Sequence, residues 1–224
     1  MSKYFTIKTI EFFVQIGLNN HKSWYLEHKN EYEEHVLEPF KNLVLELSDT
    51  MLKIDPLFTV EPKVDKTISR IYKDIRFSKD KLPFRNNAWI TFKIRSEDWK
   101  TRPCFYFEIT PEMYRYGMGF YNADTKTIGD FRTSIETDKN VFKTIINNFD
   151  KKGIFKLEGD NFKRLKNPGL SEKLWDYYRK KSFYLASNFE IDDFLFSEKL
   201  SDKLKNDFLT LKPLYDYLNK IIRK

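Results

Sequence analysis

The chain has 224 residues, 41% of them hydrophobic and 17% aromatic, and a formal net charge of +7 at pH 7. This composition excludes an intrinsically disordered chain, because it supplies ample apolar side chain for a packed core. The single cysteine, Cys104, excludes an intramolecular disulfide, a cysteine-based zinc site and a CxxC redox motif. With no signal-peptide pattern and no apolar run long enough to span a membrane, we expect a cytoplasmic protein without a membrane partner.

Helical periodicity opens the sequence. From Ile7 to Leu18 the apolar residues are spaced for one helix face, and Gly17 to Asn20 offers a stop and a new N-cap. A second apolar stripe runs at helical spacing from His21 to Leu52, where Pro39 is expected to kink or divide the helix. We expect these helices to pack together.

After Asp55 and Pro56 the hydrophobic period changes to the alternation of β-strands. Polar or proline-containing turns separate the alternating segments, which favours an antiparallel meander. The strands are expected at Ser69 to Phe77, Ala88 to Ile94, Phe105 to Ile109 and Tyr114 to Phe120.

Helical spacing returns in the second half of the chain. The elements expected there are a helix from Ile128 to Phe149, a short helix from Ser171 to Lys180, a strand from Phe183 to Phe189, and a closing helix from Leu200 to Ile222 interrupted at Pro213. The expected fold class is α+β: an antiparallel meander sheet packed against several helices on one face, in a single domain covering residues 1–224.

Positive charge gathers in two segments. Glu61 to Arg85 carries eight Lys or Arg against four Asp or Glu, and Lys199 to Lys224 carries seven against three. Because the remainder is nearly neutral, these two segments carry the excess, and they favour an anionic partner.

The strand expected at Ser69 to Phe77 has one wholly polar face, because alternate side chains of a strand point the same way. The residues on this face are Arg70, Tyr72, Asp74 and Arg76, while Ile71, Ile75 and Phe77 are expected to face the core.

We interpret this face as a candidate anion-binding site. In it Arg70 and Arg76 clasp the anion, Asp74 orients both guanidinium groups, and Tyr72 donates a hydrogen bond or acts as a weak acid. The turn that follows adds a hydroxyl and two cations, from Ser78, Lys79 and Lys81.

Three functions remain open at this point. The first is binding of a small phosphate- or nucleotide-type anion; if a reaction occurs, clustered arginines would stabilise developing negative charge. The second is a non-catalytic interaction module that binds nucleic acid or an acidic protein partner through the basic strand and the C-terminal helix. The third is a solvated face in which Arg–Asp pairs are structural.

Other candidate chemistry is weaker. His21, His28 and His35 are too far apart along a helix to share a metal, so neither a metal nor a cofactor is expected. Glu108 and Glu112 could approach the basic segment. Aromatic residues occur together with cations at Tyr114 to Tyr116 and at Trp175 to Arg179, which is compatible with base stacking, although core packing explains most of the rings. No catalytic residue is assigned, because the P-loop, nucleophile-elbow and dinucleotide motifs are absent.

Two blocks, FFVQIGLNNHKSWYLEHKNEYEEHVLEPF at Phe12 to Phe40 and SRIYKDIRFSKDKLPFR at Ser69 to Arg85, resemble the bacterial and fungal family called domain of unknown function 2461. Weaker matches extend the resemblance over most of the chain, at Gly117 to Gly119, Phe131-Arg132 and Lys166 to Gly169. The resemblance implies that the basic strand and turn help to define the family. It implies no activity and no substrate.

Overall fold

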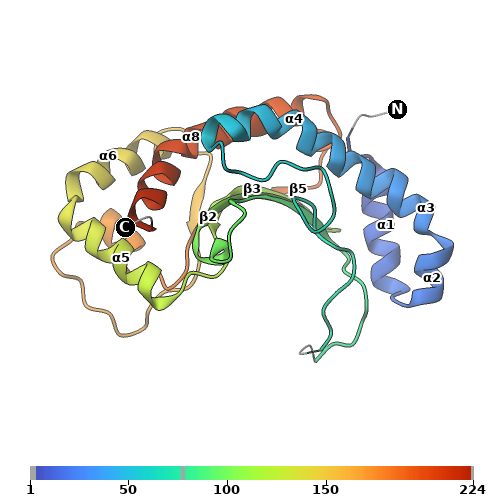
Figure 1. Ribbon diagram of the computed structural model, residues 1–224, viewed down its shortest axis with the longest axis horizontal. Coiled ribbons are helices and arrows are strands. Elements are labelled where there is room, and N and C mark those ends of the chain that lie inside the picture. The colour runs from blue at the N-terminus through green and yellow to red at the C-terminus, as the bar shows by residue number, and fades with distance from the viewer. Residues whose placement is uncertain (1–3, 77–78, 223–224) are drawn as a thin grey trace. The chain divides into compact units, whose positions relative to one another are not determined.

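A computed structural model describes residues 4–76 and 79–222 of the chain. In chain order (Figure 1) the elements are α1 (Ile7–Leu18), α2 (Lys22–Glu27), α3 (Lys29–Tyr32), a π-helical turn (Glu33–Leu37), α4 (Glu38–Ile54), β1 (Ala88–Phe92), a 3-10 turn (Trp99–Thr101), β2 (Pro103–Ile109), β3 (Met113–Phe120), α5 (Thr125–Thr137), α6 (Lys139–Asp150), β4 (Lys156–Glu158), α7 (Glu172–Tyr178), β5 (Tyr184–Glu190) and α8 (Lys199–Ile222).

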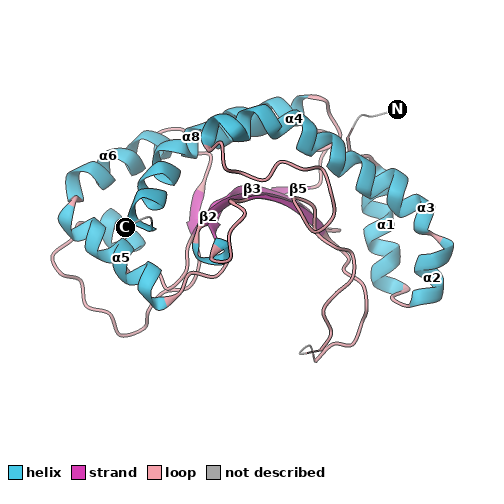
Figure 2. Cartoon of the chain, in the orientation of Figure 1, coloured by secondary structure: helices cyan, strands magenta, loops and turns pink. Residues whose placement is uncertain are grey.

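Within the described residues the strands form one five-stranded antiparallel sheet, in the order β1-β2-β3-β5-β4 (Figure 2). The first three strands are neighbours in chain order, so the predicted meander is confirmed, and with it the α+β class. β4 pairs antiparallel with β5, with Leu157 opposite Leu185. No helix in the described part of the chain combines the length and the apolarity needed to cross a membrane.

The chain divides into two compact units. Unit 1 comprises Met1–Phe92, Tyr106–Tyr116 and Asn188–Lys205, and unit 2 comprises Lys93–Phe105, Gly117–Ser187 and Asn206–Lys224. We describe the packing of each unit separately.

Aromatic rings build the core of unit 1. The ring of Phe5 lies 4.8 Å from that of Phe40 on α4 and 5.7 Å from that of Phe107 on β2. On α1, Phe12 contacts the rings of Trp24 and Tyr32, so the short N-terminal helices pack side by side as expected (Figure 1). These large rings remove much apolar surface from water and hold α4 against the sheet.

The long helix expected from His21 to Leu52 is broken at His28, whose φ is −106° and ψ 16°, between α2 and α3. At Pro39 the chain stays helical and passes through the π-helical turn instead, and the proline provides the physical reason for that turn. Proline has no backbone N–H, so the carbonyl of His35, four residues earlier, loses its helical donor. The buried Thr9 hydroxyl on α1 donates to this carbonyl at 2.6 Å. The π-helical turn directly before α4 takes up the change of register, and the Glu38 N–H donates to the Glu33 carbonyl.

Unit 2 is built around Phe142 on α6. Its ring packs against the rings of Phe131 on α5, Tyr177 on α7 and Tyr217 on α8, at centroid distances of 5.3 to 5.5 Å. Phe183, just before β5, contacts both Phe131 and Tyr177. The helices of this unit are therefore joined through one aromatic cluster.

Two sequence predictions about helices in the second half of the chain are wrong. The helix expected from Ile128 to Phe149 is two helices, because the backbone leaves helical geometry at Asp138, where φ is −115° and ψ 39°. Pro213 does not interrupt α8, which continues to Ile222. Its neighbours Leu211 and Leu214 are fully buried, and this burial offsets the lost backbone hydrogen bond.

Candidate functional site

The basic segment, residues 69–85, forms an irregular arm rather than a strand, so the predicted strand from Ser69 to Phe77 is wrong (Figure 2). We call residues 69–85 the basic arm. Its two runs of chain pair through a Lys73 N–H to Pro83 carbonyl bond and an Arg85 N–H to Ile71 carbonyl bond, both 2.8 Å. Pro83 cannot donate in return, so the pairing stays too short for a strand. Phe77 and Ser78 lie outside the described residues.

The predicted division into two faces survives without the strand. Ile71 is buried and Ile75 half-buried, whereas the four polar candidates are exposed: Arg70, Tyr72, Asp74 and Arg76. Alternation depends on extended backbone rather than on ladder hydrogen bonds, and this explains why it persists.

Two of the three arginines of the arm, Arg70 and Arg76, are held by different carboxylates. Asp74 receives two hydrogen bonds from the Arg76 guanidinium, at 2.9 and 2.7 Å. The Arg70 guanidinium bonds the Asp65 carboxylate at 2.9 Å instead. The prediction that Asp74 orients both guanidinium groups is therefore wrong. Asp65 was missed because it precedes the alternating segment, in a loop where its φ angle is 68°.

The remaining cations of the arm differ in what they contact. Lys73 bonds the Asp80 carboxylate at 3.1 Å, and the Lys81 amine donates to the Ile75 carbonyl at 3.0 Å. Lys79 is exposed, and it has no ion pair within residues 4–76 and 79–222. The Arg85 guanidinium lies over the Trp89 ring, 5.0 Å from its centroid.

Hydrogen bonds from Arg76 lower the pKa of Asp74 to about 2. The Arg76 side chain is 76% exposed and that of Asp74 48% exposed. Asp74 is therefore ionised throughout the physiological range, and the pair is an exposed ion pair rather than a proton-transfer site.

The arm is anchored to the N-terminal helices at Phe84. The Asn20 side chain forms two hydrogen bonds with the Phe84 backbone, donating to its carbonyl at 3.0 Å and accepting from its N–H at 2.9 Å. The Phe84 ring contacts Tyr25 at 4.7 Å and Tyr72 at 4.9 Å. Nothing in the sequence distinguishes Asn20 from a helix cap, so this anchor was missed.

Tyr72 has one edge in this aromatic cluster and nearly half its surface in water, being 47% exposed. Burial, with a smaller contribution from the neighbouring Tyr72, raises the pKa of Tyr25 to about 12. The Tyr25 phenol is thus protonated at neutral pH, and the cluster provides support for the arm.

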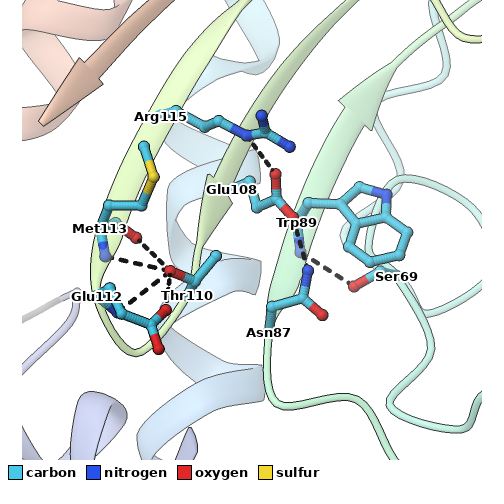
Figure 3. A network of polar contacts seen from close by, with 8 residues as sticks. All are labelled: Ser69, Asn87, Trp89, Glu108, Thr110, Glu112, Met113 and Arg115. Atoms are coloured by element: carbon cyan, nitrogen blue, oxygen red, sulfur yellow. Dashed lines mark hydrogen bonds and ion pairs between the residues drawn. The ribbon is translucent and has the colours of Figure 1, made fainter. Parts of the chain in front are cut away.

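A polar network on the adjoining sheet face involves Glu108 of β2 (Figure 3). One carboxylate oxygen accepts from the Asn87 amide and the other from the Arg115 guanidinium, both at 2.6 Å. The Glu108 side chain is only 12% exposed. Glu108 is therefore bonded to Asn87 and Arg115 and not to Arg70 or Arg76, which pair with Asp65 and Asp74.

The network continues toward both ends of the strands (Figure 3). The Trp89 N–H donates to the Ser69 hydroxyl at 3.0 Å, joining the start of the arm to β1. The Glu112 carboxylate accepts from the Thr110 hydroxyl at 3.0 Å in the turn between β2 and β3. Glu112 therefore belongs to this turn.

The histidines have local contacts in unit 1. His21 caps α2 by accepting from the Trp24 N–H, and the His28 ring stacks on the Trp24 ring at 4.0 Å. Within the described residues, no group of three His, Cys, Asp or Glu side chains is placed to hold a metal.

The comparison with protein families covers the basic arm and most of the chain. A family described as "Conserved hypothetical protein (DUF2461)" matches residues 8–217. The chain belongs to this family. The resemblance predicted from the two sequence blocks is thereby confirmed, and the DUF2461 match includes the basic arm and nearly all of both units. A comparison with curated proteins found no match.

Proposed function

We propose that this DUF2461 protein is a non-catalytic interaction module that binds nucleic acid, and that the basic arm contacts the phosphate backbone. One observation carries the proposal: Arg70 and Arg76 each hold a nearby carboxylate while remaining mostly in water. Arg70 is 63% exposed and Arg76 is 76% exposed.

This arrangement favours an extended partner over a small one. A small anion would have to displace the two-bonded Asp74 carboxylate from Arg76 without a second arginine to help, since Arg70 is bound to Asp65. A nucleic acid meets many cations at once, and the release of its counterions offsets the loss of weak exposed ion pairs.

Further cations of the arm would contact the same partner. Among the residues that the structure describes, Lys79, Lys81 and Arg85 have no carboxylate partner. Together with the net charge of +7, these cations attract an anionic polymer electrostatically.

The proposal includes a cytoplasmic location. Cys104 is buried and free, and burial raises the pKa of its thiol to about 12. A protein with one inert thiol and no disulfide suits a reducing compartment, where nucleic acid is also found.

Salt dependence of binding tests the proposal. We expect the full chain to bind fluorescently labelled DNA, with an affinity that falls steeply between about 50 and 200 mM salt. Replacing Lys79 and Lys81 by alanine should make the plot of log K against log salt less steep, by about 0.7 to 0.9 for each lost phosphate contact. The control replaces Lys8 and Lys53, two exposed lysines of α1 and α4, by alanine. It removes equal charge, and its salt dependence should stay steeper than that of the variant at Lys79 and Lys81.

Three results would overturn the proposal. Absence of DNA binding at low salt would remove nucleic acid as the partner. Binding of polyglutamate in its place would point to an acidic protein. Tight binding of pyrophosphate or a nucleotide that Arg70→Ala or Arg76→Ala alone abolishes would restore the small-anion clasp.

A further inference from the structure

Positive charge is unevenly divided between the two units. Unit 2 contains 22 Lys and Arg against 13 Asp and Glu, whereas unit 1, which carries the basic arm, contains 18 against 20. The excess charge of the chain therefore belongs to unit 2. A polyanion has a stronger electrostatic reason to contact this unit.

Within unit 2 the loop from Gly159 to Leu170 is held firmly at its start. Its first residues pair with the chain after α7, through a Phe162 N–H to Arg179 carbonyl bond of 2.8 Å and a Lys181 N–H to Asp160 carbonyl bond of 2.7 Å. Gly159 has a φ of 108°, and a side chain there would run into the Ser182 carbonyl. We call residues 159–170 the basic loop.

The end of the basic loop is held as well. The Asn167 side chain accepts from the N–H groups of Gly169 and Leu170 at 3.0 and 2.7 Å, and donates to the Leu170 carbonyl at 3.0 Å. A loop fixed at both ends presents its middle residues in a defined place, which lowers the entropy lost when a ligand binds.

The cations in the middle of the basic loop are free. Lys163, Arg164 and Lys166 are exposed, and none has an ion pair or hydrogen bond from its side chain within the described part of the chain. Arg70 and Arg76 of the basic arm, in contrast, each hold a carboxylate.

Beside them, Phe162 offers an aromatic surface. Its ring is 38% exposed, and the Arg132 guanidinium from α5 lies 4.2 Å from the ring centroid. A phenyl ring in water that already stacks on a guanidinium can also stack on a nucleobase.

Arg132 is itself an uncompensated cation. Its guanidinium donates to the carbonyls of Tyr178 and Lys180, at 3.0 and 3.5 Å, and within residues 4–76 and 79–222 it pairs with no carboxylate. Burial lowers the pKa of Arg132. A nearby phosphate would therefore relieve a poorly solvated positive charge.

We infer that the basic loop is a single-strand nucleic-acid contact, in which a base stacks on Phe162 and phosphates meet Arg132, Lys163 and Arg164. This inference rests on the proposed function for its partner class, but it uses a different surface. A single strand fits better than a duplex, because only an unpaired base can offer its face to Phe162.

The test compares single-stranded oligothymidine with a duplex of equal length, using the full chain. Phe162→Ala should weaken oligothymidine binding about tenfold or more and leave duplex binding unchanged, because stacking is lost and charge is kept. Phe162→Trp should restore the affinity, and Phe162→Leu, which keeps an apolar side chain without a π face, should not. Unchanged thermal unfolding shows that each variant is folded.

The loop cations have their own readout. Alanine at Lys163, Arg164 and Lys166 together should make the plot of log K against log salt for oligothymidine less steep by about 1.4, at about 0.7 for each of the two phosphate contacts assigned to Lys163 and Arg164. The same three changes should leave binding of neutral and anionic lipid vesicles as it was.

The outcomes separate this inference from the proposed function. If arm variants weaken DNA binding and loop variants do not, the inference is wrong and the function stands. If loop variants weaken oligothymidine binding and arm variants do not, the inference stands and the role of the arm is wrong. Equal losses for oligothymidine and duplex with Phe162→Ala, or loss of binding to phosphatidylserine vesicles alone, would overturn the single-strand contact.

Discussion

The basic arm of unit 1 and the basic loop of unit 2 differ in what their cations already hold. The arm has six Lys or Arg against two Asp, and the loop has three against one. In the arm, however, Arg70, Lys73 and Arg76 each bind a carboxylate, whereas Lys163, Arg164 and Lys166 of the loop bind none within the described residues. The charge count of a segment therefore does not tell which cations can meet a partner.

The largest expected effect concerns how the basic loop is anchored. Gly159→Ala should lower the free energy of unfolding by at least about 3 kcal/mol, because the new methyl group meets the Ser182 carbonyl and the backbone has a positive φ. Gly169→Ala is the matched control: its φ is also positive, at 90°, but the space around it is open, so about 1 to 2 kcal/mol is expected. Urea unfolding measures both, and equal losses would mean that the start of the loop is not tightly held.

The anchor of the basic arm should be the next most sensitive point. Asn20→Ala leaves the N–H and carbonyl of the buried Phe84 without their side-chain partner, and we expect a loss of about 1 to 3 kcal/mol in the free energy of unfolding. The control is Asn86→Ala, at an exposed asparagine beside the arm, which should change stability by less than about 0.5 kcal/mol. Equal effects in urea unfolding would contradict the anchor.

The pairing inside the arm predicts a pH dependence. The pKa of Asp74 is lowered to about 2 from its ordinary 3.8, chiefly by hydrogen bonds from Arg76. Because the folded pKa is depressed, the stabilisation from this pair is present above pH 3.8 and disappears as the pH falls toward 2. NMR titration of the Asp74 carboxyl carbon should show its midpoint rising toward 3.8 in Arg76→Ala and much less in Arg70→Ala. The reverse order would mean that Arg70 is its partner.

The smallest effect is expected for the loop cations. Arg164→Ala removes an exposed side chain with no partner in the described structure, so the free energy of unfolding should change by less than about 0.5 kcal/mol. Chemical denaturation with and without added salt measures this. A clear loss of stability that salt reproduces in the unmodified protein would show that Arg164 is paired after all, and the contrast between arm and loop would fail.

Residue periodicity was sufficient to predict much of the fold. Helical spacing of apolar residues predicts α1, and alternation of apolar and polar residues predicts the β1-β2-β3 meander. The faces predicted to be apolar are the buried ones in the structure. Pro39 was expected to kink or divide a helix, but the chain stays helical there and passes through a π-helical turn, while the break lies at His28. Pro213 was not a break, because the burial of its neighbours outweighs one missing hydrogen bond and no local pattern reports burial.

The candidate site was predictable in its residues but not in its contacts. Exposure of Arg70 and Arg76 followed from alternation, yet the choice of Asp65 over Asp74 for Arg70 depends on how the preceding loop turns. The stacking of Arg132 on Phe162 joins residues 30 positions apart, and no spacing rule links them. Side-chain pairing between distant segments is settled by packing, which a single sequence does not display.

The hydroxyl that Thr9 gives to the His35 carbonyl makes two distant positions energetically interdependent. With Pro39 replaced by alanine, a new backbone N–H would compete for that carbonyl, so the hydrogen bond from Thr9 would contribute less to stability. Changes at Thr9 and at position 39 should then be non-additive, and a double-mutant cycle would measure a coupling between them. Thr9 of α1 therefore stabilises the fold most in a chain that has a proline at position 39. A designer who transplants α1 to another scaffold would have to move both positions together.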